Sequence, residues 1–237
     1  MNNLIQSAKE NVTFLLVCLG IIAGIIILAA LAQRFLCKAV PKRRGVKYIV
    51  FVAMFAAISG VLMTIEIPLF FAPSFYKLDL SEIPVLMCSF YLGPVAGVVC
   101  ELLKVLVKLL LKSTSTAFVG DFANFVVGCT MILPASIIYH VKKSKKSAII
   151  GMASGTAIMT VFGSLFNGVY LLPKFSQLVG MPLDAIIAMG AEVNPAINSV
   201  YMLVLLAVVP FNLLKGAIVS VVTFFLYKRL EPVLFRD

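Results

Sequence analysis

The sequence predicts an all-α integral membrane protein. Of its 237 residues, 62% are hydrophobic and only 13% are charged, and the mean hydropathy is +1.08. Soluble domains are closer to half apolar and a quarter charged. Most of the apolar residues fall in runs of about 20, the length that crosses a bilayer as a helix. The chain therefore has room for six or seven spans with short connectors, and for no sizeable soluble domain.

The first apolar run covers residues 12–36. It is longer than the hydrophobic segment of a signal peptide and no basic cluster precedes it, so we expect a retained helix rather than a cleaved leader. Five basic residues follow it instead, namely Lys38, Lys42, Arg43, Arg44 and Lys47.

Further spans are predicted at 48–66, 83–94, 96–112, 118–140, 148–172 and 200–228. The second and third of these are separated only by Gly93 to Gly97, which is typical of a tight turn between short helices. The longest connector is 173–199, and its apolar stretch 182–192 is expected to form a short helix at the membrane surface.

Basic and acidic residues occupy alternate connectors. Lysine and arginine gather at 37–47, at 140–147 and at the C-terminal end, whereas the remaining connectors hold acidic residues, namely Glu66, Asp79, Glu82, Asp184 and Glu192. Basic loops remain in the cytoplasm. The pattern predicts a multi-pass protein of the cell membrane with seven spans, its N-terminus outside and its C-terminus in the cytoplasm.

Several classes of function are disfavoured by the residues. The net charge of +10 lies between apolar runs rather than along one solvated face, which argues against nucleic acid as a partner. The chain has no GxxxxGK[ST] motif, no HExxH motif, no nucleophile elbow and a single histidine, so we expect no enzyme activity. Its five cysteines form no CxxC pair, and no cofactor or metal is expected.

Polar residues inside the predicted spans are the candidates for a site. Asn212 and Lys215 share a helix face near the middle of the last apolar run, Asn167 lies in the span before it, and Asp121 and Asn124 share a face of another span. A patch of amides and one cation in an apolar wall would suit a flat heteroaromatic ligand with carbonyl and N–H groups on one edge. Alternatively, Lys215 neutralises a buried acid or snorkels, and the asparagines join helices.

Glu101 begins a charged stripe that needs no ligand. Lys104 and Lys108 lie three and seven residues further on, so we expect a local ion pair, with Lys112 reaching the outer headgroups. Small residues at matching spacing, Ala53 with Ala57 and Gly151 with Gly155, would let other helices approach closely.

Four segments resemble a known family. FYKLDLSEIPVLMCSFYLGPVAGVVCELLK (75–104) resembles the substrate-binding S components of energy-coupling factor (ECF) vitamin transporters. TSTAFVGDFANFVVG (114–128), PLDAIIAMGAEVNPAI (182–197) and PFNLLKG (210–216) are similar to the riboflavin-specific members of that family. The likeness covers about residues 47–230 in the expected order.

The resemblance implies a six-helix core at 47–230 that binds riboflavin from outside, together with a coupling subunit in the membrane and two cytoplasmic ATPases. It assigns hydrogen bonds to the flavin ring to Asn167, Asn212 and Lys215. It also implies that the loop 68–79 covers the site, which makes Lys77 and Asp79 candidates beside Asn124 and Asp121. Ala53 and Ala57 match the family's docking motif for the coupling subunit.

One segment departs from the family. The helix at 12–36 adds a seventh span, so residues 1–46 are expected to form an additional N-terminal helix with its basic loop, and 231–237 a cytoplasmic tail. Two other functions remain open: an S component for another flat vitamin such as thiamine, favoured by an acid-lined pocket, and a membrane assembly protein that binds no small molecule.

Overall fold

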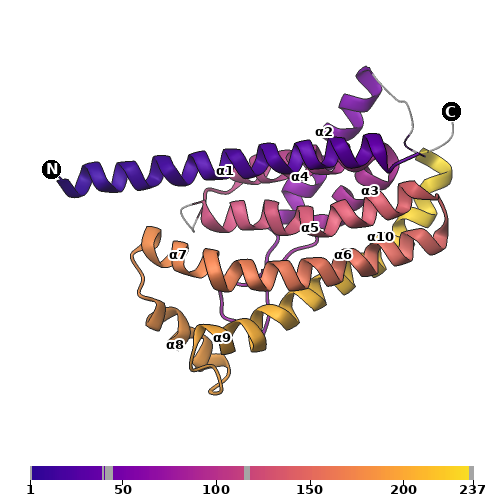
Figure 1. Cartoon of the computed structure of the whole chain (residues 1–237). Coiled ribbons are helices and arrows are strands. Elements are labelled where there is room, and N and C mark those ends of the chain that lie inside the picture. Colours follow the sequence, from indigo (N-terminus) through magenta and orange to yellow (C-terminus); the bar gives the residue numbers. More distant parts are fainter. Residues whose placement is uncertain (1, 39, 41–44, 115–117, 235–237) are drawn as a thin grey trace.

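The computed structural model describes residues 2–38, 40, 45–114 and 118–234, and it forms an elongated helical bundle (Figure 1). The α-helices are α1 (Asn2–Phe35), α2 (Val46–Thr64), α3 (Glu82–Leu92), α4 (Pro94–Leu111), α5 (Val119–Val141), α6 (Lys145–Phe166), α7 (Leu172–Val179), α8 (Leu183–Val193), α9 (Val200–Leu203) and α10 (Val209–Leu234). Two π-helical segments, η1 (Asn167–Leu171) and η2 (Val204–Val208), and two short strands, β1 (Ile67–Pro68) and β2 (Lys77–Leu78), complete it.

The predicted all-α class is confirmed, and the chain is a multi-pass membrane protein. Five helical stretches in the described part are long and apolar enough to cross a membrane, namely Val12–Phe35, Val46–Thr64, Val119–Val141, Lys145–Val179 and Val200–Tyr227. The other two predicted spans correspond to α3, which is only 11 residues long, and to α4, whose 18 residues include three charged ones.

Some predicted boundaries were wrong. The predicted span 148–172 runs on through η1 and α7 to Val179, so the connector after it is shorter than expected. The expected short helix within this connector is present as α8. The C-terminal helix extends to Leu234 and so includes part of 231–237, and the assignment of that segment to a cytoplasmic tail stays a prediction. Lys42, Arg43 and Arg44 of the predicted basic loop, and residues 235–237, lie outside the described residues.

Both π-helical segments precede a proline. Pro173 follows η1 and Pro210 follows η2. A proline inside a helix lacks the N–H that would bond the carbonyl four residues earlier, and its ring crowds that carbonyl. The backbone relieves this conflict with a wider turn of the π type, which is common at functional sites. The loosened backbone expected near Pro210 is therefore present, and the two wide turns contact each other.

Helices α5 and α6 pack closely against each other in the core. Gly151 and Gly155 face the backbone carbonyls of Ala135 and Met131 so closely that a Cβ atom on either glycine would collide with them. The small-residue pair predicted from spacing therefore does bring two helices together. The adjacent core is apolar and includes Phe90, Met131 and Met159.

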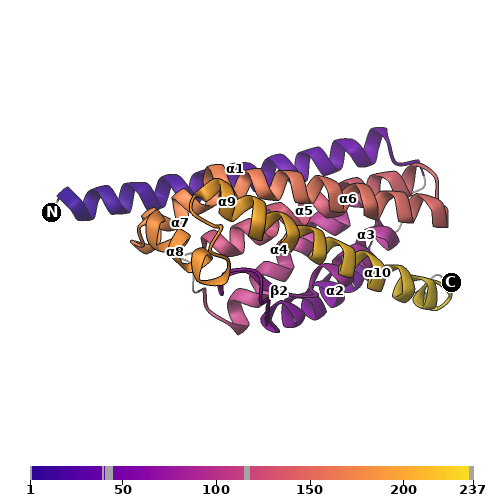
Figure 2. The ribbon, with the colours of Figure 1, turned by 90° about the horizontal axis from the view of Figure 1, so that it is seen from below.

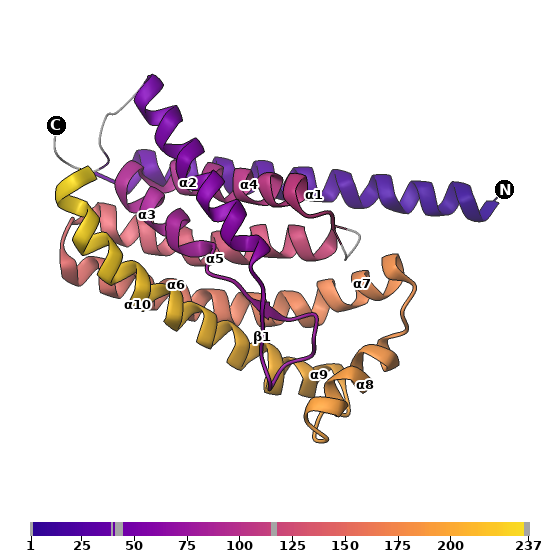
Figure 3. The same cartoon turned by 180° about the vertical axis from the view of Figure 1, so that it is seen from behind.

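The two ends of the bundle differ. The N-terminus of α1 lies at the end that carries α7 and α8, while the turn between α5 and α6 and the end of α10 lie at the opposite one (Figures 1 and 2). The chain from 65 to 81 folds back along one side through the β1–β2 pair, in which Ile67 faces Leu78 and Pro68 faces Lys77 (Figure 3). This segment, with α5, η1, α7 and α10, encloses the site described next.

Candidate functional site

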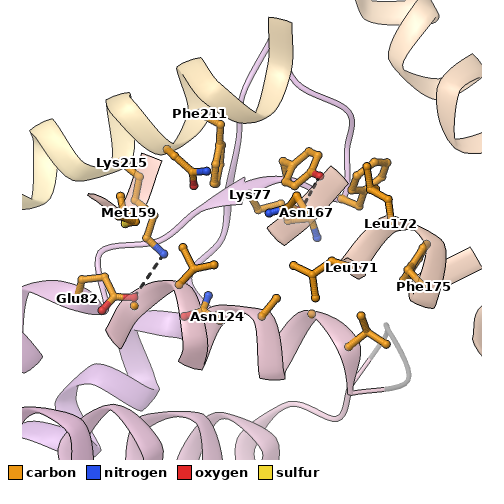
Figure 4. A pocket seen from close by; sticks show the side chains of 18 residues that line it. Lys77, Glu82, Asn124, Met159, Asn167, Leu171, Leu172, Phe175, Phe211 and Lys215 are labelled. Atoms are coloured by element: carbon orange, nitrogen blue, oxygen red, sulfur yellow. Dashed lines mark hydrogen bonds and ion pairs between the residues drawn. The ribbon is translucent and has the colours of Figure 1, made fainter. Parts of the chain in front are cut away.

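A pocket of about 180 Å³ lies between α5, α7, α10 and the 75–77 segment (Figure 4). Its apolar wall includes three aromatic rings, those of Phe75, Phe175 and Phe211, and the rings of Phe75 and Phe175 stack with centroids 6.3 Å apart. The polar side chains on its wall come from five different segments and are Tyr76, Lys77, Glu82, Asn124, Asn167, Asn212 and Lys215. Apolar walls with a few converging polar groups are typical of small-molecule sites.

Lys215 is buried and forms an ion pair with a residue far away in the chain. Its Nζ lies 3.0 Å from Oδ2 of Asp79 and 3.7 Å from Oε1 of Glu82. Burial opposes ionisation of Asp79, but the ammonium groups of Lys215 and Lys104 outweigh it and lower the pKa of this carboxyl to about 2. The charge of Lys215 is therefore compensated by the loop before α3, which supports the alternative that Lys215 neutralises a buried acid.

Lys104 contacts two residues of the pocket lining, Glu82 and Asn124, and is completely buried. Its Nζ lies 2.9 Å from Oε1 of Glu82, 2.5 Å from Oε1 of Glu101 and 3.0 Å from Oδ1 of Asn124. The predicted pair of Glu101 with Lys104 is thus confirmed. Gly128 makes room for it, because a Cβ atom there would collide with the Glu101 carboxylate.

The outer part of the charged stripe pairs differently from the prediction. Lys108 forms an ion pair of 2.5 Å with Asp121, and Lys112 forms one of 2.9 Å with Glu66. The carboxylate of Glu66 on the loop binds the ammonium group of Lys112, whose side chain is 47% exposed, and its expected position at the outer headgroups stays a prediction. Burial raises the pKa of Glu66, but hydrogen bonds from Lys77 and Lys112 outweigh this and hold it below its usual range.

The three pocket amides differ in how much of their hydrogen-bonding capacity the protein uses. Both polar atoms of Asn167 have a partner, since its Oδ1 accepts from the Tyr76 hydroxyl at 2.9 Å and its Nδ2 donates to the Gly163 carbonyl at 2.7 Å. Asn124 accepts from Lys104 through Oδ1. Asn212 is buried, and its Nδ2 has no hydrogen-bond partner among the described residues. Buried donors normally have a partner, so this one points to a ligand.

Most of the predicted site residues meet at the pocket. Asn124, Asn167, Asn212, Lys215 and Lys77 line it, and Asp79 lies behind Lys215. The exception is Asp121, which pairs with Lys108 and is not part of the lining.

Sequence reasoning missed Glu82, Tyr76 and the three aromatic rings. For Phe75 and Tyr76 a signal was available, because two adjacent aromatic residues lie in a short loop between polar residues. Glu82 gave none, because its proximity to Lys104 and Lys215 is created by tertiary packing.

Residues 47–227 match the family described as "ECF transporter, substrate-specific component". The chain belongs to this family. Among curated relatives, it is 35% identical over 190 residues to the riboflavin transporter RibU of Staphylococcus aureus, which covers 80% of this chain and 93% of the relative. It is 29% identical over 188 residues to the riboflavin transporter FmnP of Bacillus subtilis, covering 79% and 93%.

A solved structure of the S component of a bacterial ECF transporter is also similar to this chain. The two sequences are 35% identical, and the structures agree with a TM-score of 0.63 over 80% of this chain and 98% of the other. These findings confirm the family suggested by the sequence segments. They also confirm that the chain is a transporter component and not an enzyme.

The first prediction tests whether Asp79 stabilises the protein by compensating Lys215. Asp79→Asn should lower the free energy of unfolding by roughly 3–5 kcal/mol, because it leaves a buried ammonium group without its main partner. The removal of both charges in Asp79→Asn/Lys215→Met should restore most of this loss. Denaturation of the ligand-free protein in detergent measures both effects.

The matched control is Lys112→Met, which breaks a partly exposed pair and should cost at most about 1 kcal/mol. Equal stability of Asp79→Asn and the wild type would show that the buried pair does not hold the loop.

Proposed function

We propose that the chain binds riboflavin from the outside and carries it across the membrane as the substrate-binding subunit of an ECF transporter. The observation that carries this proposal is the buried Nδ2 of Asn212, a donor without a partner among the described residues, on the wall of the pocket. The isoalloxazine ring of riboflavin is flat and has carbonyl and N–H groups along one edge. Such a ring matches a pocket that combines aromatic walls with a line of amides.

Each polar residue has a defined role in this proposal. Asn212 and Lys215 donate to acceptors on the ring, and Asn124 offers its Nδ2, because its oxygen is held by Lys104. Asn167 joins the site by exchanging its bond with Tyr76 for one with the ligand. The segment 68–79 covers the pocket and brings in Lys77, while Asp79 positions Lys215.

The pocket's electrostatics disfavour a cationic vitamin such as thiamine. Glu82 lines the pocket and Asp79 lies beside it, which by itself would suit a cation. However, Lys104 and Lys215 already pair with these carboxylates inside the protein. A further cation would have to displace a buried lysine, whereas a neutral ring would not. The family membership and the pocket likewise disfavour an assembly protein without a small-molecule ligand.

We also propose that α2 is the docking site for the membrane-embedded coupling subunit, through which two cytoplasmic ATPases drive transport. Ala53 and Ala57 are exposed on one face of α2, next to the exposed apolar residues Met54, Ile58 and Val61. Two small residues four apart allow another helix to approach closely. The chain has no P-loop, which fits the use of ATP by partner subunits.

The proposed topology places the pocket end outside and comprises six core helices and α1. The lysine-rich turn between α5 and α6 lies at the other end, with the end of α10, and basic loops are retained in the cytoplasm. The N-terminus then faces outside and the C-terminus inside.

The second prediction tests Asn212. Asn212→Leu should weaken riboflavin binding by roughly tenfold, which is the upper range for one hydrogen bond. It should not destabilise the ligand-free protein, because Nδ2 has no hydrogen-bond partner among the described residues. The matched control is Thr223→Val on the same helix, which also removes a buried unpartnered polar group but lies outside the pocket lining. Fluorescence quenching of riboflavin measures affinity. Equal affinities for the two variants would remove Asn212 from the site.

The third prediction tests the docking face. Ala53→Leu/Ala57→Leu should abolish ATP-driven riboflavin uptake in cells, because the larger side chains keep the coupling subunit away. Riboflavin binding by the purified chain should be unchanged. Ala153→Leu/Ala157→Leu is the matched control, with the same spacing on the exposed face of α6. Normal uptake by the α2 variant would refute the assignment.

The fourth prediction tests orientation. In a chain whose native cysteines are replaced, a cysteine at Asn3 should react with a membrane-impermeant maleimide in intact cells. A cysteine at Ser144, within the lysine-rich turn, should react only after the cells are permeabilised. The reverse labelling pattern would invert the topology.

A further inference from the structure

The additional helix α1 precedes the family region at 47–227, yet it is docked at defined positions. It packs along α4 and α5, with Ala29 and Ala32 buried in the contact (Figure 1). Near its C-terminal end, Oε1 of Gln33 accepts a hydrogen bond of 3.1 Å from the backbone N–H of Val95. This N–H belongs to the first turn of α4, where no carbonyl of the same helix is available. Gln33 thereby caps the N-terminal end of α4, which shows that α1 contacts the core through a specific polar bond as well as through apolar packing.

The other half of α1 reaches the pocket end through Phe14. This ring is 8% exposed and meets the ring of Phe122 on α5 edge-on, with centroids 6.1 Å apart. The ammonium group of Lys174, on α7, lies 5.9 Å from the centre of the same ring. Phe14 therefore contacts two helices that come from different parts of the core.

Both helices contribute to the pocket wall. Val119, Gly120 and Ala123 of α5 line the pocket, and so does Phe175 of α7. Neither Phe14 nor Phe122 belongs to the lining, so their contact lies behind the wall. The ring of Phe122 also contacts the ring of Phe166, with centroids 6.5 Å apart. Phe166 immediately precedes η1, which begins at Asn167.

We infer that α1 is a brace that holds α5 and α7 together from behind, and that Phe14 is a positioning residue that slows release of the bound ligand. This inference rests on the proposed function, because it concerns the same pocket. The ligand touches the inner faces of α5 and α7, so its escape is easier when the two walls can separate. An edge-on aromatic contact and a cation over a ring both oppose that separation.

The test compares release rates from the full-length protein. Purified variants are loaded with riboflavin, and release into an excess of a flavin-binding scavenger is followed by fluorescence. Phe14→Leu, which keeps most of the buried apolar volume, should accelerate release roughly two- to tenfold, the range expected for loss of one aromatic pair. Phe14→Tyr keeps the ring and should restore the wild-type rate. The control Leu15→Ala changes a side chain that is 59% exposed on the same helix and should have no effect.

Two further readouts separate positioning from general stability. The thermal unfolding midpoint of ligand-free Phe14→Leu should stay close to that of Leu15→Ala. If Phe14 acts through Phe122, then Phe14→Leu should add little acceleration to a chain that already carries Phe122→Leu. Release at the wild-type rate by Phe14→Leu would overturn the brace alone, whereas a wild-type protein that binds no riboflavin would overturn the proposed function with it.

Discussion

The buried charges around Lys104 and Lys215 constrain the whole structure. An ammonium group inside a membrane protein is tolerated only where oxygen ligands replace water, so each lysine requires acidic or amide partners at hydrogen-bond distance. Asp79 comes from the loop, Glu82 from α3, Glu101 from α4 and Asn124 from α5. Five segments are thereby fixed to one another, including α10, which carries Lys215. The pocket adjoins this network through Glu82, Asn124 and Lys215, which belong to both.

This network also shows where sequence reasoning succeeds and where it stops. The pairing of Glu101 with Lys104 was predictable, because three residues on a helix fix the distance between two side chains. The pairing of Lys215 with Asp79 spans 136 positions, and no local rule connects them. For Lys112, the position on the helix indicated the direction of the side chain but not its pairing with Glu66. Local periodicity thus identifies a charge that needs a partner, while the partner is chosen by packing.

The same distinction holds for the fold and the pocket. The long apolar runs and the glycine pair at 151 and 155 were sufficient to predict most of the helices and one of their contacts. Pro210 indicated a local disturbance of its helix. The π geometry of both turns and their contact with each other were not predictable, because they depend on both prolines and on the packing around them. Glu82 and Phe175 enter the pocket only because α3 and α7 are placed beside it. The resemblance to known S components predicted a role for Asn167, Asn212 and Lys215, which do line the pocket, but it did not show that the three amides of the pocket differ in their hydrogen bonding.

In the proposed function, the hydrogen bond between Tyr76 and Asn167 links the loop to the occupancy of the pocket. Tyr76 belongs to the segment proposed to cover the site, and its hydroxyl donates to the amide oxygen of Asn167 that the proposed ligand would use. A ligand that replaces Tyr76 at this oxygen forms one hydrogen bond while the protein loses one, so the net enthalpy change at Asn167 is small. What changes instead is the freedom of the covering segment, which loses one of its tethers when the pocket fills. Thermodynamic linkage then requires the reverse effect as well: any interaction outside the pocket that draws the loop away from Asn167 would favour occupancy of the pocket.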